Sequence, residues 1–350
     1  MKDLDELYMR RCIQLARCGV GSTSPNPAVG AVIVCDGRII GEGYHIRAGE
    51  PHAEVNAVNS VSEKDRALLS QSTIYVTLEP CSHYGKTPPC CDLIIEKGIK
   101  RVVIGTTDNN QCVNGAGIAR MKQAGIEVIV GVLSDECARL NQPFFTYHGL
   151  RRPAVTLKWA QTADGYIDTF REGGEPVHIS TPVSQVAVHK LRSTHDAILV
   201  GTRTAMLDNP SLNLRCWAGR SPLRLVMDRT GKLPTTFRLF DGSLPTVVYT
   251  EKEQVDKFGK NVEQVVLDFS KDILSQILSH LYSIKVSSLL VEGGSQLLQS
   301  FIDASLWDCA RVEVNRSLLV GAGVPAPLIP VEKLVEKTLC GGNEILTFSK

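Results

Sequence analysis

Four side chains in the first hundred residues have the types and the spacing of a metal-dependent hydrolytic site. His52 and Glu54 are separated by one residue, Cys81 follows a proline, and Cys90 follows two prolines. Two thiolates and a neutral imidazole can hold Zn²⁺ in a tetrahedron whose open fourth position activates a water near neutral pH. The pattern therefore predicts a catalytic zinc site in which His52, Cys81 and Cys90 are the ligands.

Glu54 is better suited to proton transfer than to metal binding. It lies two residues from His52, whereas a co-ligand on the same helix face would be four residues away. We expect it to carry a proton from the attacking water to the substrate ring nitrogen and the leaving ammonia. A histidine, a glutamate two residues on, and a Pro-Cys before a second cysteine form the arrangement of zinc-dependent deaminases.

These residues also have simpler interpretations. A lone His-x-Glu is usually a surface helix turn, and a lone pair of cysteines is usually two small buried side chains. His83 and Cys91 are alternative ligands, but we expect Cys91 to pack in a core and His83 to line the pocket. A purely structural zinc, or no metal, is the remaining alternative to a catalytic zinc.

The composition indicates a cytoplasmic enzyme of two domains. The chain has 350 residues, 43% hydrophobic and 21% charged, which is long for a single core. A net charge of +1 without a Lys/Arg run argues against a nucleic-acid partner. The N-terminus is acidic, and no apolar run approaches the roughly 20 residues that cross a membrane. Eleven cysteines, an odd count, favour buried thiols and a metal set over disulfides.

Strand and helix patterns alternate along the chain, which predicts an α/β fold class. In residues 1–145 the predicted strands are Ala31–Cys35, Arg38–Gly41, Thr73–Leu78, Arg101–Gly105 and Ile126–Val130. The predicted helices there are Leu7–Cys18, Ala53–Val61, Asp92–Lys97 and Ile118–Gln123. The segment Asn141–Arg152, which contains Pro143 and Gly149, breaks this pattern and predicts a boundary, with residues 146–350 as a second domain.

The second domain repeats the alternation without repeating the sequence. Its predicted strands are Ala154–Lys158, Ala197–Val200, Leu223–Met227, Thr246–Tyr249 and Leu289–Val291, and its predicted helices are near Pro182–Leu191, Ile273–Tyr282 and Gln296–Ile302. No G-x-G-x-x-G is present, so a Rossmann site is not supported. Glu292-Gly293-Gly294-Ser295 instead leads from a strand into a helix, where a phosphate could approach free N–H groups, although ordinary turn chemistry gives the same pattern.

Several longer stretches resemble one family. In the first domain they are SPNPAVGAVIV (Ser24–Val34), GEGYHIRAGEPHAEVNAV (Gly41–Val58) and YVTLEPCSHYGKTPPCCDLII (Tyr75–Ile95). In the second they are LKWAQTADGYI (Leu157–Ile167), LRSTHDAILVGTRTAMLDNPSLNLR (Leu191–Arg215) and LLVEGGSQLLQSF (Leu289–Phe301). Together they resemble the bifunctional deaminase/reductase of riboflavin biosynthesis over nearly the whole chain.

This resemblance implies a cytidine-deaminase-like three-layer N-terminal domain and a dihydrofolate-reductase-like C-terminal domain. The first would hydrolytically deaminate 2,5-diamino-6-(5-phosphoribosylamino)pyrimidin-4(3H)-one with one Zn²⁺. The second would use NADPH to reduce the ribosyl side chain, giving 5-amino-6-(5-phosphoribitylamino)uracil. The implied partner is thus a small phosphoribosyl-pyrimidine, not a nucleic acid or a membrane, and a homo-oligomer is compatible with it.

The resemblance also implies roles for matched residues. In the deaminase domain the implied substrate contacts are Asn26, His45, His83, Lys86 and Asn110. In the reductase domain they are Lys158, Arg192, Leu212, Arg215 and Glu292, with the two arginines on the substrate phosphate. The implied NADPH contacts are Ala160, Thr204, Asp208, Gly294, Ser295, Gln296 and Leu297.

Three stretches depart from the family pattern. Pro176-Val177-His178-Ile179 replaces a Ser-x-Trp-Ile-type run, so the tryptophan contact to the cofactor is either replaced by His178 or lost. Asp228-Arg229 replaces Asp-Ser, and Arg229 is one candidate for the 2'-phosphate of NADPH. Asp108–Val113 keeps Asn110 but lacks two prolines of the family pattern.

Other functions remain as alternatives. A deaminase of the same class with an impaired reductase domain would share the zinc motif. A nucleic-acid-editing deaminase with a fused binding domain would need a basic surface, which the net charge of +1 does not favour. A zinc-stabilised binding module would not need Glu54 beside an open coordination position.

Overall fold

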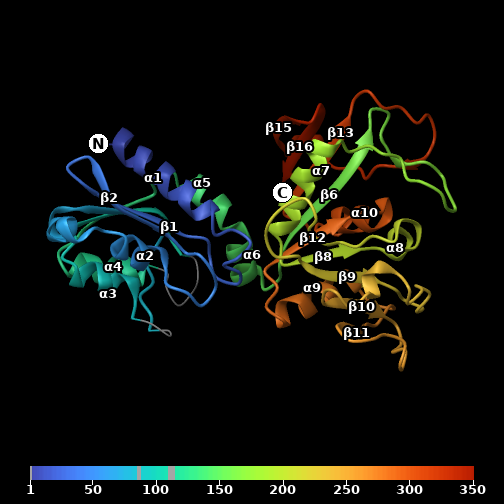
Figure 1. Cartoon of the computed structure of the whole chain (residues 1–350), viewed down its shortest axis with the longest axis horizontal. Helices are drawn as coiled ribbons and strands as arrows, with labels where there is room; N and C mark the ends of the chain where they lie inside the picture. Colours follow the sequence, from blue (N-terminus) through green and yellow to red (C-terminus); the bar gives the residue numbers. More distant parts are fainter. Residues whose placement is uncertain (1, 85–87, 109–114) are drawn as a thin grey trace. The chain divides into compact units, whose positions relative to one another are not determined.

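The computed structural model describes residues 2–84, 88–108 and 115–350. It divides into two compact units, Met1–Arg151 and Arg152–Lys350 (Figure 1). Lys86 and Asn110, both expected to contact substrate, lie outside the described residues. None of the helices within the described ranges is long and apolar enough to cross a membrane.

The N-terminal unit contains one five-stranded sheet. Its strands are β1 Gly30–Cys35, β2 Arg38–Tyr44, β3 Thr73–Leu78, β4 Arg101–Thr106 and β5 Glu127–Val130, in the order β2-β1-β3-β4-β5. Its helices are α1 Lys2–Arg17, α2 Ala53–Asn59, α3 Cys90–Glu96, α4 Ala116–Gln123, α5 Ser134–Leu140 and α6 Gln142–Leu150, with a 3-10 helix at Glu63–Gln71. β1 is antiparallel to β2 and β3, whereas β3, β4 and β5 are parallel.

Alternating apolar side chains on β1 explain the three layers of this unit. Ala31 and Ile33 face a core that includes residues of α2, α3 and α4, and Val32 and Val34 face a second core with α1 and α5. A strand presents successive side chains to opposite faces, so a wholly apolar strand requires a cover on both sides. Figure 1 shows α1 and α5 on one side of the sheet and α2, α3 and α4 on the other.

The C-terminal unit contains a nine-stranded mixed sheet. Its strands follow the order β11-β10-β9-β8-β12-β6-β13-β16-β15, and a separate small ladder joins β7 and β14. The strands are β6 Ala154–Thr162, β7 Tyr166–Asp168, β8 Ala197–Val200, β9 Leu223–Met227, β10 Thr246–Thr250, β11 Val262–Val266, β12 Ser288–Glu292, β13 Cys309–Asn315, β14 Val324–Pro325, β15 Leu334–Cys340 and β16 Asn343–Ser349. The helices are α7 Pro182–Ser193, α8 Thr202–Asp208, α9 Ile273–Ser283 and α10 Ser295–Asp303, with 3-10 turns at Arg238–Phe240 and Val331–Lys333.

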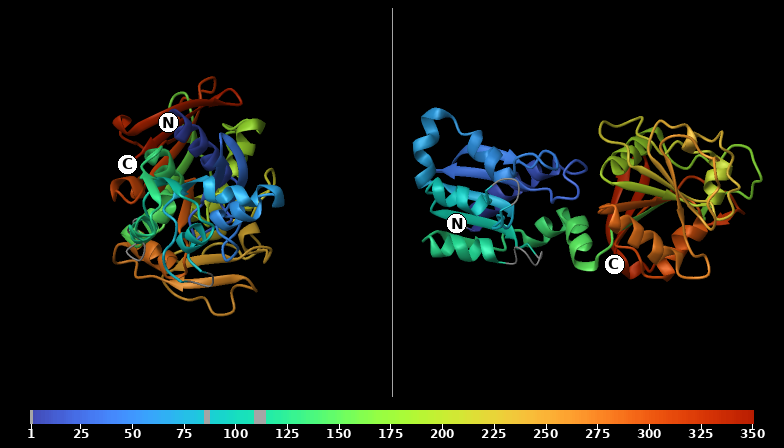
Figure 2. Two further views of the ribbon diagram at one scale, coloured as in Figure 1. Left: turned by 90° about the vertical axis from the view of Figure 1, so that its left-hand side faces the viewer. Right: turned by 90° about the horizontal axis from the view of Figure 1, so that it is seen from below.

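Helices also cover both faces of this second sheet (Figure 2). Side chains of α9 and α10 pack in the larger core, and Ala205 of α8 and Leu191 of α7 pack on the opposite face. β6, β8, β9 and β12 run parallel, so their carboxyl ends meet at one edge. In open α/β sheets that edge is where ligands bind.

The predicted α/β class and the two layered units are confirmed, but the sequence analysis omitted several elements. The segment Asn141–Arg152 was expected to be a break, but it contains α6. Pro143 is compatible with this helix because it lies in the first turn, where proline is tolerated. The division between units therefore falls after Arg151, whereas the sequence analysis placed it after residue 145. α5, α8, β7, β11 and the strands from β13 onward were also not predicted.

Candidate active sites

The first site joins three side chains from different elements of the N-terminal unit. His52 lies at the N-cap of α2, Cys81 follows β3, and Cys90 is the first residue of α3. His52 Nδ1 lies 3.6 Å from Cys81 Sγ and 3.4 Å from Cys90 Sγ. One potential ligand atom from each residue lies within 4.8 Å of the others, which suits a tetrahedral zinc with a histidine and two cysteines.

Close packing of α2 on β2 fixes the position of His52 and Glu54. A Cβ added at Gly43 would lie 2.3 Å from the backbone nitrogen of Ala57, so glycine permits this contact between helix and strand. The amide of Asn56 donates to the carbonyls of Tyr44 and Pro51 at 2.8 and 3.2 Å. These contacts hold the segment before α2 and thereby orient the N-cap histidine.

A second histidine lies beside the predicted ligand. The rings of His45 and His52 meet edge to face, with their centroids 5.4 Å apart. His45 Nδ1 lies 3.1 Å from the Pro51 carbonyl, which can only accept a hydrogen bond, so this nitrogen carries the proton. Nε2 then accepts from the Asn26 amide at 3.4 Å. Burial lowers the pKa of His45, which keeps this ring neutral.

Glu54 is buried beside the cluster, as a proton carrier requires. Its side chain is 3% exposed, and burial, together with the charge of Cys81, raises the pKa of this carboxyl to about 7. A carboxyl with a pKa near the working pH can both accept and release a proton. The burial of Glu54 and its pKa near 7 are the observations on which a proton-transfer role can be proposed.

The pKa values of the two thiols in the cluster are shifted in opposite directions. Hydrogen bonds from the Cys90 thiol, from His52 and from the Cys90 N–H lower the pKa of Cys81 to about 4, despite its burial. The bond to Cys81 and burial raise the pKa of Cys90. The backbone N–H at the start of α3 therefore stabilises the Cys81 thiolate.

Glu79 binds the backbone at the start of α4, a contact that was not predicted from the sequence. This carboxylate is buried, and its two oxygens accept backbone N–H groups of Asp108, Gly115, Gly117 and Ile118 at 3.1 to 3.4 Å. A Cβ at Gly117 would lie 2.3 Å from the carbonyl oxygen of Pro80. The start of α4 is therefore held directly against the chain that leads to Cys81. The position of Glu79, two residues before a predicted ligand, was the available signal.

The remaining predicted residues of this unit have different environments. Cys91 is fully buried in the core, as expected. His83 is exposed. Neither lies in the cluster of His52, Cys81 and Cys90.

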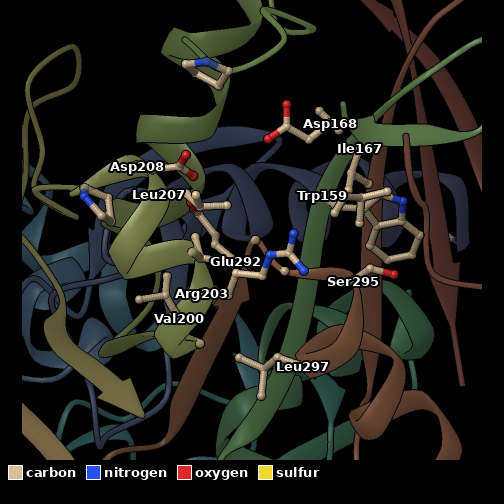
Figure 3. A pocket seen from close by; sticks show the side chains of 18 of the residues that line it. Trp159, Ile167, Asp168, Val200, Arg203, Leu207, Asp208, Glu292, Ser295 and Leu297 are labelled. Atoms are coloured by element: carbon tan, nitrogen blue, oxygen red, sulfur yellow. The ribbon is translucent and has the colours of Figure 1, made fainter. Parts of the chain in front are cut away.

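The second site is a cavity of about 930 Å³ at the carboxyl edge of the C-terminal sheet (Figure 3). Its walls come from the ends of β6, β8, β9 and β12, from α7, α8 and α10, and from residues 167–180. The predicted residues that line it are Lys158, Ala160, Arg192, Thr204, Asp208, Leu212, Glu292, Gly294, Ser295, Gln296 and Leu297. The structure thus brings together residues that are 139 positions apart in sequence, between 158 and 297.

The glycine pair between β12 and α10 forms a turn that suits a phosphate group. Gly293 and Gly294 have positive φ angles of 72° and 49°, which favour glycine. A Cβ at Gly294 would lie 2.9 Å from Thr204 Oγ1. No described side chain caps the start of α10, so its first N–H groups are available to an anion. These features fit a dinucleotide such as NADPH.

Ion pairs organise the ionisable groups of the cavity. Arg192 donates two hydrogen bonds to Glu292, at 2.9 and 2.7 Å. Burial raises the pKa of Glu292, but the charge and hydrogen bonds of Arg192 outweigh burial and lower it to about 2. Lys158 is the register partner of Glu292 on β6, and its charge acts in the same direction. Arg171, which the sequence analysis missed, bonds Asp168 at 2.6 Å and also bonds Asp208.

Of three further polar residues predicted near the reductase site, only His178 lines the cavity. Arg215 is exposed and bonds Asn213 Oδ1 at 3.2 Å, and it is not among the described residues that line the cavity. Arg229 is also outside that set, and its guanidinium bonds Glu251 at 2.9 and 3.2 Å. His178 does line the cavity, at the position where the family pattern has tryptophan.

Comparisons with known proteins match both units. Residues 2–106 match the cytidine and deoxycytidylate deaminase zinc-binding region, and residues 153–342 match the RibD C-terminal domain. The riboflavin biosynthesis protein RibD of Aquifex aeolicus is 41% identical over 312 residues, which cover 88% of this chain and 86% of the relative. That of Actinobacillus pleuropneumoniae is 40% identical over 336 residues, which cover 94% and 87%.

Two solved structures have the same fold as this chain over nearly its full length. A diaminohydroxyphosphoribosylaminopyrimidine deaminase/5-amino-6-(5-phosphoribosylamino)uracil reductase from Thermotoga maritima has a TM-score of 0.90 and 40% identity, with 99% of each chain covered. RibD from Acinetobacter baumannii has a TM-score of 0.86 and 32% identity, with 100% of this chain and 99% of that one covered. Fold and site thus define an enzyme with a zinc-dependent deaminase unit followed by an NADPH-dependent reductase unit. The chain belongs to the RibD family of bifunctional riboflavin biosynthesis proteins.

Proposed function

We propose that this chain catalyses two consecutive reactions on one small molecule. The first is the hydrolytic deamination of 2,5-diamino-6-(5-phosphoribosylamino)pyrimidin-4(3H)-one. The second is the NADPH-dependent reduction of the ribosyl side chain, which gives 5-amino-6-(5-phosphoribitylamino)uracil. The observation that carries the proposal is the cluster of His52, Cys81 and Cys90 with buried Glu54 beside it.

In the deaminase unit the residues divide into a metal-binding set and a proton carrier. His52, Cys81 and Cys90 would hold the zinc, which would supply the Lewis acidity for water activation near neutral pH. Glu54 accepts the two protons of the attacking water in turn. It passes the first to the ring nitrogen and the second to the leaving amine, so that ammonia departs as the carbonyl forms. Asn26 and neutral His45 form a hydrogen-bonded pair beside the metal site that we assign to substrate binding.

In the reductase unit, NADPH supplies the hydride and the chain supplies orientation. The uncapped start of α10 at Gly294 and Ser295 accommodates the cofactor phosphates. Lys158 and Glu292 lie at paired positions on neighbouring strands and face the cavity, where they can bond the sugar hydroxyls. We also assign Arg192 and Arg215 to the substrate phosphate, with Arg192 oriented by Glu292.

We propose a cytoplasmic enzyme that acts on small molecules and not on nucleic acids. The net charge of +1 supports this assignment, because nucleic-acid binding relies on clusters of cations. A titration of the full chain with RNA at low and high salt tests it directly. Salt-dependent binding would favour an editing deaminase instead.

The glutamate role is tested by Glu54→Gln, with Glu50→Gln as the control. Glu50 is exposed and its carboxylate lies 4.0 Å from the Arg47 guanidinium, and its charge has the smallest of the effects on the pKa of His45, so its substitution should leave both metal content and ammonia release unchanged. Glu54→Gln should retain zinc at the wild-type stoichiometry but abolish ammonia release. Retained deamination in this variant would contradict the assigned role. The reductase assignment is tested separately, by loss of reduced-nicotinamide absorbance when the deaminated intermediate is supplied.

A further inference from the structure

Among the described residues that line the reductase cavity, one arginine forms no ion pair or hydrogen bond with another described side chain. Its described ionisable lining includes four cations, Lys158, Arg171, Arg192 and Arg203, and three carboxylates. Arg192 is paired with Glu292, and Arg171 is shared between Asp168 and Asp208. Lys158 lies beside the same Glu292, whose pKa it lowers. Within the part of the chain that the structure describes, Arg203 alone among these arginines forms no ion pair.

The position of Arg203 places it away from the chemistry but along the path of the cofactor. It lies in the first turn of α8, which follows β8, and its side chain is exposed. β8 neighbours β12, and β12 neighbours β6, so the start of α8 is two strands, roughly 10 Å, from Ala160 on β6. Thr204, the next residue, contacts the Gly293-Gly294 turn before α10.

A dinucleotide can follow this order across the sheet edge. The reacting ring belongs at the buried end, near Ala160, Lys158 and Glu292, and the shared pyrophosphate suits the uncapped start of α10. The next group outward is the adenosine ribose, which would lie at the start of α8. A phosphate on that ribose is strongly hydrated, so an exposed guanidinium at the rim is a suitable partner for it.

We propose that Arg203 binds the 2'-phosphate of NADPH and makes this chain select NADPH over NADH. The proposal rests on the reductase function assigned above, because it requires that the cavity takes a dinucleotide. It also replaces Arg229 as the candidate for this contact, since Arg229 is paired with Glu251, stacks on Phe269 and is not among the described lining residues. Arg203 discriminates between cofactors and has no part in hydride transfer.

The test measures direct binding of NADPH and of NADH to the full-length chain, by titration of nucleotide fluorescence. The variants are Arg203→Gln and, for the rival position, Arg229→Gln. Losing a charge-assisted contact should weaken NADPH binding by about ten- to a hundredfold in Arg203→Gln. NADH binding should change by less than about twofold, since NADH has no 2'-phosphate. Arg229→Gln should bind both dinucleotides as the wild type does.

Three other results would each overturn the proposed contact between Arg203 and the 2'-phosphate. An equal loss of NADPH and NADH affinity in Arg203→Gln would place Arg203 at the pyrophosphate and overturn the proposal. Unchanged NADPH affinity, with a higher KM for the pyrimidine substrate, would place it at the substrate phosphate and overturn it also. A wild-type chain that binds neither dinucleotide would overturn the reductase function together with this inference. Only the last outcome affects the proposed function.

Discussion

Replacing Glu79 by glutamine should loosen the deaminase unit by an amount that follows from its hydrogen bonds. Oε2 accepts the N–H groups of Asp108 and Gly115, and Oε1 accepts those of Gly117 and Ile118. Glutamine keeps one oxygen, so two N–H groups lose their acceptor and face an amide that also donates. Each unsatisfied buried donor costs about 1 to 3 kcal/mol, so the total is about 2 to 6 kcal/mol.

Amide hydrogen exchange of the full chain is the sharpest assay for this change. The N–H groups of Gly117 and Ile118 should exchange at least about tenfold faster in Glu79→Gln, because their protection depends on the carboxylate. Ammonia release should fall, while NADPH oxidation with the deaminated intermediate should persist, since the reductase unit has its own core.

The control is Glu96→Gln on α3, where the side chain is 70% exposed and bonds only the neighbouring Lys97. It should change the free energy of unfolding by less than about 0.5 kcal/mol. If Glu79→Gln is as stable as this control and its amides remain protected, the four bonds do not hold α4. The proposed support of the Cys81 segment would then be wrong.

Three further predictions concern the metal, the acid dependence of stability and a close backbone contact. Cys90→Ser should lower the zinc content measured by atomic absorption. Cys91→Ala should retain zinc and lose only about 1 kcal/mol of stability, because Cys91 packs in the core. Equal zinc loss in both variants would contradict the ligand assignment. The pKa of Glu292 is lowered from 4.5 to about 2, so its contribution to stability is complete above pH 4.5 and is lost as the pH falls toward 2. Urea unfolding should therefore show a wild-type stability that falls between pH 5 and 3 by about 2 kcal/mol more than that of Glu292→Gln, and parallel pH profiles would refute this. Gly117→Ala should destabilise the deaminase unit, because the new Cβ would lie 2.3 Å from a carbonyl oxygen. Gly149→Ala has open space around the new Cβ and should stabilise α6 by about 0.5 to 1 kcal/mol. Thermal unfolding of each variant measures these changes.

Helices and strands were predictable from the sequence where the pattern of apolar residues matches the side chains that are buried in the fold. The strand Thr73–Leu78 was predicted with its observed bounds, since five of its six residues are buried and apolar or β-branched. β15 was missed because its side chains are mostly exposed and show no alternation. α6 was missed because Pro143 and Gly149 indicated a break, although proline at a helix start is compatible with the helix.

The metal cluster was predictable because its residues occur in a recognisable pattern of types and intervals. Cys81 lies in the turn after β3, Cys90 begins α3, and His52 lies at the N-cap of α2, so three short segments bring the ligands together. The support from Glu79 was not predictable in this way, because its partners lie 29 to 39 residues away and are backbone groups. The unpaired state of Arg203 likewise depends on which arginines find carboxylates after folding.

A two-stage assay tests the central claim most directly. Purified chain is incubated with the diaminopyrimidine substrate, with and without NADPH, while ammonia and reduced nicotinamide are followed separately. The account predicts ammonia release in both cases and NADPH oxidation only after deamination. Glu54→Gln should release no ammonia and yet oxidise NADPH when the deaminated intermediate is added. Ammonia release by Glu54→Gln at the wild-type rate, or no NADPH oxidation by the wild type with that intermediate, would contradict the account.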